Sequence, residues 1–134
     1  MASVIDIEGI GPAYAEKLKE AGVATTDSLL EKGATPKGRA ALEEATGISH
    51  KLVLKWVNMA DLYRIKGVGS EYSELLEVAG VDTVPELAQR NAANLHAKMA
   101  EVNGEKNLVR ELPTLHAVES WVAQAKELPR VVTY

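Results

Sequence analysis

The feature that most constrains the fold of this chain is an ungapped internal repeat. The segment from residue 7 to residue 30 aligns with the segment from residue 65 to residue 88, and eleven of the 24 aligned positions are identical. A repeat of this length predicts that each copy forms the same structural unit. The dipeptide Trp-Val also recurs, at 56–57 and 121–122, at an offset of 65 instead of 58. The second copy therefore contains about seven extra residues, around 103–113.

The residue types within the repeat predict helices. The chain has no Phe, two Trp and four Tyr, so its core must be mostly aliphatic, which suits packed helices better than a sandwich of strands. Pro12 stands where the first turn of a helix is expected, Gly22 follows the last apolar residue of that helix, and Thr25 is a typical N-cap of the next. No segment alternates convincingly between apolar and polar residues. We predict an all-α fold of tandem units packed into one compact helical domain.

The repeat and its helix start and stop signals also predict the domain organisation. We place the first unit at 1–62, the second at 63–128 and an extended C-terminal tail at 129–134, which either frays or docks on a neighbour. Each unit should close with a helix whose tryptophan, Trp56 or Trp121, packs in the core.

Local signals in the second unit predict further detail. We expect a capping box between Thr83 and Glu86 and a helix capped by Asn94 that ends at 103–104. A short helix should follow it and stop at Pro113.

The residues that carry the repeat resemble the helix-hairpin-helix motif. In the first copy they are Ile7, Gly9, Ile10, Gly11, Ala15, Leu18, Gly22, Val23 and Thr25. In the second copy they are Ile65, Gly67, Val68, Gly69, Leu76, Gly80, Val81 and Thr83, with Ser73 where alanine is usual. Nearly the whole chain also resembles a bacterial tandem helix-hairpin-helix family catalogued as a domain of unknown function, through TPKGRAALEEATGIS, LKWVNMADLYRIKGVG and the terminal VVTY. This resemblance implies the fold and brings no established activity.

A glycine turn that opens into a helix can hold a phosphate. The glycines let the backbone turn tightly, and the first N–H groups of the helix are unpaired and carry a partial positive charge. Such contacts would not read nucleic-acid sequence. The contacting set expected in the first copy is Gly9, Ile10, Gly11, Ala13 and Tyr14 through backbone groups, helped by Lys17, Lys37 and Arg39.

The charges beside the two turns differ from those of phosphate binders, which usually carry a basic residue in the first helical turn. The first copy has Ala13 at that position and the second has Glu71. Residues 7–22 have a net charge of −1 and residues 65–80 a net charge of −2. We therefore expect the second turn, formed by Gly67, Val68 and Gly69, to be structural.

Composition argues against several classes of protein. The net charge is −4, shared equally by residues 1–62 and 63–134, so the basic footprint of a dedicated nucleic-acid binder is missing. Without cysteine there is no thiol nucleophile or thiolate metal site, and the three histidines are not spaced as metal ligands. No catalytic motif is present. We expect a cytoplasmic protein that is not an enzyme, with no cofactor, no metal and no membrane span.

Two functional hypotheses follow. The motif favours a non-catalytic module that makes weak, sequence-independent contacts with a nucleic-acid backbone through the first hairpin. The acidic balance favours a protein–protein adaptor or assembly subunit in which the hairpins are only structural and the terminal PRVVTY segment contributes to a protein contact. Both alternatives stay open at this point.

Overall fold

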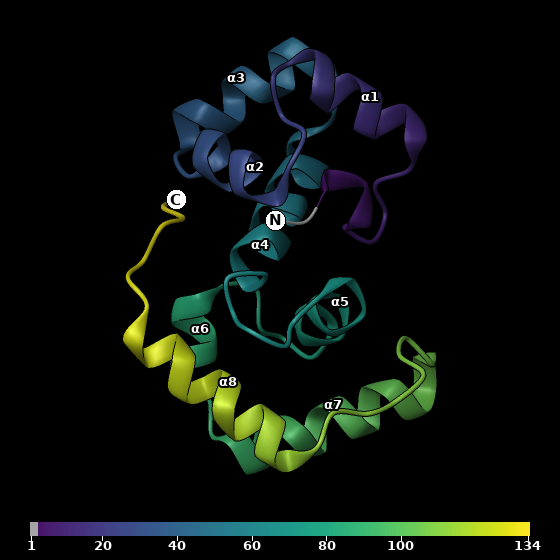
Figure 1. The fold of residues 1–134 in the computed structure, drawn as a ribbon, viewed down its shortest axis with the longest axis vertical. Coiled ribbons are helices and arrows are strands. Elements are labelled where there is room, and N and C mark those ends of the chain that lie inside the picture. Colours follow the sequence, from purple (N-terminus) through teal and green to yellow (C-terminus); the bar gives the residue numbers. More distant parts are fainter. Residues whose placement is uncertain (1–2) are drawn as a thin grey trace. The chain divides into compact units, whose positions relative to one another are not determined.

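The chain is all-α, as the sequence predicts, in a computed structural model that describes residues 3–134 (Figure 1). A single turn of 3-10 helix, η1 (Val4–Asp6), precedes eight α-helices. These are α1 (Pro12–Glu20), α2 (Thr26–Gly33), α3 (Pro36–Thr46), α4 (His50–Leu62), α5 (Ser70–Val78), α6 (Val84–Ala88), α7 (Ala92–Lys106) and α8 (Leu115–Glu127). The described residues contain no strand and one isolated antiparallel bridge, between Ser3 and Thr25.

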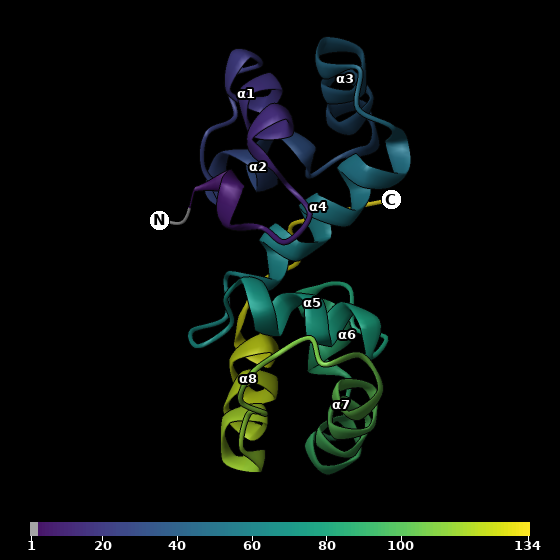
Figure 2. The same cartoon turned by 90° about the vertical axis from the view of Figure 1, so that its right-hand side faces the viewer.

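The helices form two compact units. The first comprises Met1–Asp61 together with Val131–Tyr134, and the second comprises Leu62–Arg130. Within the first unit α3 packs against both α1 and α2. Within the second unit α8 packs against α6 and α7, and Figure 2 shows α7 and α8 side by side. The last four residues of the chain, Val131–Tyr134, are not helical, and we refer to them below as the C-terminal tail.

The glycine turn that opens each hairpin has the same backbone conformation in both units. Gly9 has φ of 95° and Gly67 has φ of 97°, in the left-handed region that favours glycine. In the first turn the N–H of Ile10 donates to the carbonyl of Ile7, and in the second the N–H of Val68 donates to the carbonyl of Ile65. Both distances are 3.1 Å. A Cβ at Gly9 would lie 3.4 Å from the indole nitrogen of Trp56, and a Cβ at Gly67 would lie 2.9 Å from that of Trp121. The backbone conformation therefore favours glycine at both positions, and at Gly67 the adjacent indole also leaves no room for a Cβ.

Each tryptophan is buried in the core, as expected from the sequence. Trp56 is 1% exposed and Trp121 is 3% exposed. A half-buried tyrosine from the first helix of the hairpin covers each one. The ring centroids of Tyr14 and Trp56 are 5.2 Å apart, and those of Tyr72 and Trp121 are 5.3 Å apart. Such tilted and edge-on arrangements are favoured between aromatic rings.

Capping differs between the two copies of the repeat. The hydroxyl of Thr25 accepts a hydrogen bond from the backbone N–H of Ser28 at 3.1 Å, and a capping box closes there. The box predicted between Thr83 and Glu86 is wrong. Thr83 makes no side-chain cap, and its hydroxyl instead donates to the carboxylate of Glu86 at 3.3 Å. The copies thus share residue types at this position but use them differently.

The prediction for residues 91–113 is also wrong in detail. Asn91, and not Asn94, caps α7 by accepting from the N–H of residue 94 at 3.0 Å. The helix continues through Gly104, which in a helix interior costs about 1 kcal/mol relative to alanine, and ends at Asn107 with φ of 51°. The side chain of Asn103 then bonds the N–H and carbonyl of Val109 at 3.0 and 3.3 Å. These bonds hold residues 107–113 as a loop instead of the predicted short helix.

Candidate functional site

The first glycine turn presents an uncapped helix start. Gly11 is the N-cap of α1 and offers no side chain to the first N–H groups, and Pro12 follows it. A Cβ built at Gly11 would meet nothing within 4 Å, and Ala13 is exposed. The N–H groups of residues 13 and 14 therefore begin α1 at an open surface, where the positive end of the helix dipole lies.

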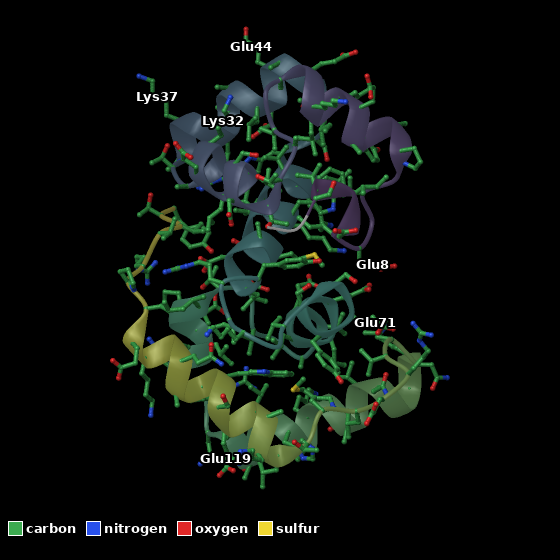
Figure 3. The ribbon with its side chains drawn as sticks, in the orientation of Figure 1. Glu8, Lys32, Lys37, Glu44, Glu71 and Glu119 are labelled. Atoms are coloured by element: carbon green, nitrogen blue, oxygen red, sulfur yellow. The ribbon has the colours of Figure 1, made fainter. Side chains whose placement is uncertain are left out.

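Not every residue of the predicted phosphate-binding set belongs to this surface. The amide of Ile10 is used inside the turn, where it donates to the carbonyl of Ile7 at 3.1 Å, and its side chain is 4% exposed. Ile10 therefore packs, contrary to the expectation that its backbone would contact a phosphate. Lys17 remains exposed on α1, with its Nζ 6.0 Å from the centroid of the Tyr14 ring. The exposed carboxylate of Glu8 adds negative charge within the turn (Figure 3).

The two basic residues of α3 do not join the first turn. Figure 3 shows Lys37 and Glu8 on opposite sides of the first unit, so Lys37 points into solvent away from the turn. Arg39 is only 3% exposed. Both were expected to assist phosphate binding; the burial of Arg39 contradicts this for Arg39, whereas the role of Lys37 stays a prediction. Arg39 shares the buried face of α3 with Leu42 and Thr46, and that spacing of three and seven residues was visible in the sequence.

The second glycine turn lies among acidic groups, and the helix that follows it contacts the extra loop of this copy. The hydroxyl of Tyr72 donates to the backbone carbonyl of Glu111 at 2.9 Å. Glu71 pairs with Arg110 at 3.7 Å on the exposed surface. Burial raises the pKa of the Tyr72 hydroxyl above 10.0, and the carboxylates of Glu111 and Glu71 raise it further. A negative environment of this kind disfavours an anion at the second turn.

The C-terminal tail binds to the first unit through its main chain. The N–H of Thr133 donates to the carbonyl of Ala34 at 2.8 Å, and the Thr133 hydroxyl donates to the same carbonyl at 3.3 Å. The guanidinium of Arg39 donates from Nη2 to the carbonyl of Thr133 at 2.7 Å. Val132 is 2% exposed and so provides an apolar anchor. The tail is therefore held without helical structure, by main-chain hydrogen bonds at Thr133 and by the buried side chain of Val132.

Two contacts of Tyr134 complete this arrangement. Its hydroxyl donates to the Oδ1 of Asn58, on α4, at 3.1 Å, and its ring centroid is 5.6 Å from the Cζ of Arg39. The tail is bonded by Ala34, which follows α2, by Arg39 of α3 and by Asn58 of α4. Gly33, at the end of α2, accepts from Arg39. We call these four residues the tail-binding site. The sequence pattern is compatible with a tail that frays or docks, and no motif in it points to this site.

Arg39 is the unusual member of the tail-binding site. Its Nη1 donates to the carbonyl of Gly33 at 2.8 Å and its Nη2 to that of Thr133, so both partners are neutral. Its Nε is buried and has no hydrogen-bond partner among the described residues. No carboxylate of residues 3–134 forms an ion pair with it. A buried guanidinium that lacks a counter-ion and keeps an unmatched N–H is an electrostatically incomplete site.

The remaining polar clusters give no other candidate site. Within residues 3–134 no three His, Asp or Glu side chains lie close enough together to hold a metal ion. His50 pairs with Glu43 at 2.8 Å, and a ring nitrogen of His96 lies 2.9 Å from the carbonyl of Pro113. None of the described helices has the length and apolar character needed to cross a membrane.

No solved structure matches this chain. A protein-family model described as Domain of unknown function (DUF4332) matches residues 8–128. The match includes both glycine turns and the helices from α1 to α8, and it ends before the C-terminal tail. It confirms the expected relation to a domain-of-unknown-function family. The chain therefore belongs to the DUF4332 family.

Proposed function

We propose that this chain is a non-catalytic module of helix-hairpin-helix type that binds other proteins, and that its first unit is the binding unit. The two glycine turns with φ near +95°, each followed directly by a helix, support the helix-hairpin-helix assignment. The observation that carries the binding proposal is the tail-binding site, because it holds an extended segment by main-chain hydrogen bonds.

Recognition of an extended segment through its main chain is a general mode of protein–protein binding. The backbone bonds provide affinity for many sequences, and a pocket for one side chain adds selectivity. Here the backbone groups of Thr133 provide the first element and the buried Val132 provides the second. The net charge of −4 agrees with a protein partner better than with nucleic acid.

In this proposal the chain's own tail competes with a partner segment. A covalently attached segment has an effective concentration on the order of millimolar, so a free peptide in the micromolar range cannot displace an intact tail of equal affinity. The competition can be shifted with Val132→Ser, which removes the apolar anchor. Val131→Ser is the matched control, because the same change is made at a neighbour that is only half-buried.

The experiment measures binding of a labelled peptide with the sequence of residues 129–134 to the full-length variants by fluorescence anisotropy. Amide exchange at Thr133, whose N–H donates to Ala34, first establishes that Val132→Ser releases the tail. We expect Val132→Ser to bind the peptide and Val131→Ser and the natural chain to bind it far more weakly. Failure of the released variant to bind the peptide would remove the support for this function.

A second candidate function rests on the first glycine turn. The start of α1 has no side-chain cap, and a Cβ at Gly11 would meet no atom within 4 Å. Lys17 lies about one turn further along the helix. These features support weak contact with a nucleic-acid backbone. With so few basic residues nearby, such binding would involve few phosphates, and its salt dependence would be shallow, with a slope of about −0.9 per phosphate on duplex DNA.

Gly11→Asp tests this candidate, with Gly69→Asp as the control at the equivalent position of the second unit. Neither glycine has a positive φ and neither would crowd a neighbour, and aspartate is a favourable N-cap, so both variants should fold. Anisotropy with labelled single-stranded DNA, double-stranded DNA and RNA is measured at low and physiological salt. Loss of binding in Gly11→Asp alone supports a phosphate contact at the first turn. Equal binding by both variants, or no binding by the natural chain at low salt, excludes it.

A further inference from the structure

The chain's own tail leaves the charge of Arg39 unmatched. The guanidinium is 3% exposed and donates to two carbonyl oxygens, while its Nε has no hydrogen-bond partner among residues 3–134. Removing a charge from water is unfavourable unless an opposite charge and a full set of hydrogen bonds compensate for it. The tail supplies one backbone oxygen and the face of the Tyr134 ring, at 5.6 Å, and it supplies no carboxylate side chain.

We infer that the tail-binding site is a docking site for an extended segment of another protein that carries an acidic side chain at the position where the tail carries Tyr134. This inference names the partner class of the proposed protein-binding function and rests on that function. The backbone of the partner would take the bonds now made by Thr133 with Ala34 and Arg39. Its carboxylate would approach Arg39 from the side that the tyrosine ring now covers.

Charge complementarity is what favours an acidic occupant over a second copy of the tail. A hydrogen bond between a guanidinium and a carboxylate is roughly twice as strong as one between neutral groups, and a carboxylate has two oxygens that can meet two N–H groups of the fork. A carboxylate here would neutralise the buried charge and could also satisfy the unmatched Nε of Arg39. The tail places a tyrosine ring over the guanidinium, and none of its side chains is a carboxylate.

The geometry of the tail fixes where the acid must be. The ring of Tyr134 is the tail side chain that lies over the Arg39 guanidinium, whereas the Thr133 hydroxyl is directed to the carbonyl of Ala34. A carboxylate at position 133 would face that carbonyl and be repelled. A glutamate at position 134 has the reach to bring its oxygens to the guanidinium in place of the ring. The expected pattern in a partner is therefore a buried aliphatic residue followed, two residues later, by an acid.

The test uses full-length Val132→Ser, in which the tail is released, and peptides of residues 129–134 with amidated C-termini. One peptide carries Tyr134→Glu and its matched control carries Tyr134→Gln, which has nearly the same shape and no charge. We expect the glutamate peptide to bind about tenfold more tightly than the glutamine peptide. The difference should shrink at high salt and disappear in the double variant Val132→Ser/Arg39→Gln.

A measurement in the otherwise natural chain keeps the inference testable if the double variant does not fold. Tyr134→Glu and Tyr134→Gln are compared by amide exchange at Thr133, and the glutamate variant should exchange more slowly because its tail is held more firmly. Equal peptide affinities together with equal exchange rates would overturn the acidic partner and leave the protein-binding function in place. If no peptide binds to the released variant, both the inference and the proposed function fail.

Discussion

Alanine at the two positive-φ glycines should destabilise the chain by different amounts. Gly9 and Gly67 have nearly the same φ, 95° and 97°, so the backbone cost of a Cβ is equal at the two positions, about 1–2 kcal/mol. The packing cost is not equal. A Cβ at Gly9 would lie 3.4 Å from the Trp56 indole nitrogen, which is a tolerable contact, whereas at Gly67 it would lie 2.9 Å from that of Trp121, which must then move.

Trp121 cannot move freely, because it is 3% exposed and packs against Tyr72 with ring centroids 5.3 Å apart. Forcing a buried side chain aside costs about 1–3 kcal/mol. We therefore expect Gly9→Ala to lower the free energy of unfolding by about 1–2 kcal/mol and Gly67→Ala to lower it by about 2–4 kcal/mol. Urea denaturation followed by tryptophan fluorescence measures both, since the chain has one tryptophan in each unit.

The second glycine of each turn provides the control. Gly11 and Gly69 have negative φ, and a Cβ at either would meet nothing within 4 Å. Alanine at these positions should leave stability unchanged or raise it slightly, because it restricts the unfolded chain. If Gly67→Ala costs no more than Gly9→Ala, the packing argument is wrong. If neither costs more than the control substitutions, the argument from backbone conformation is wrong as well.

Two further predictions follow from the caps and from Tyr72. Thr25→Val removes the hydroxyl that caps α2 and should cost about 1 kcal/mol in urea denaturation, more than Thr83→Val, which removes no cap; equal costs would contradict the assigned difference between the copies. Because folding raises the pKa of Tyr72 above 10.0, its contribution to stability is complete below pH 10 and is lost as the pH rises through the raised pKa. Tyr72→Phe should flatten this alkaline part of the stability profile, and an unchanged profile would show that Tyr72 does not cause it.

Sequence reasoning was most successful where a residue type has one main physical use. The glycine–aliphatic–glycine spacing, Pro12 and the recurring tryptophans each have few structural uses, so they predicted helices, turns and core correctly. Thr83 and Asn94 failed as predicted caps because Thr and Asn side chains can choose among several local partners. The Thr83 hydroxyl bonds the Glu86 carboxylate, and Asn91 caps α7. Residue spacing alone does not specify these partners.

The candidate site was harder to predict than the fold. The charge of Arg39 suggests a contact with phosphate at the surface. Its spacing from Leu42 and Thr46 instead places it on the buried face of α3. The four-residue tail has no periodicity from which its destination could be deduced, and Thr133 lies 99 residues away in sequence from its partner Ala34. Long-range docking of a short extended segment depends on a surface that exists only after the first unit has folded.

Binding of a peptide with the sequence of residues 129–134 to full-length Val132→Ser is the most direct test of the proposed function. We expect binding to appear when the tail is released, to increase when the peptide carries Tyr134→Glu, and to be far weaker with Val131→Ser at the same concentration. A released chain that binds no extended peptide, with its helices intact by circular dichroism, would contradict the claim that the first unit is a protein-binding unit.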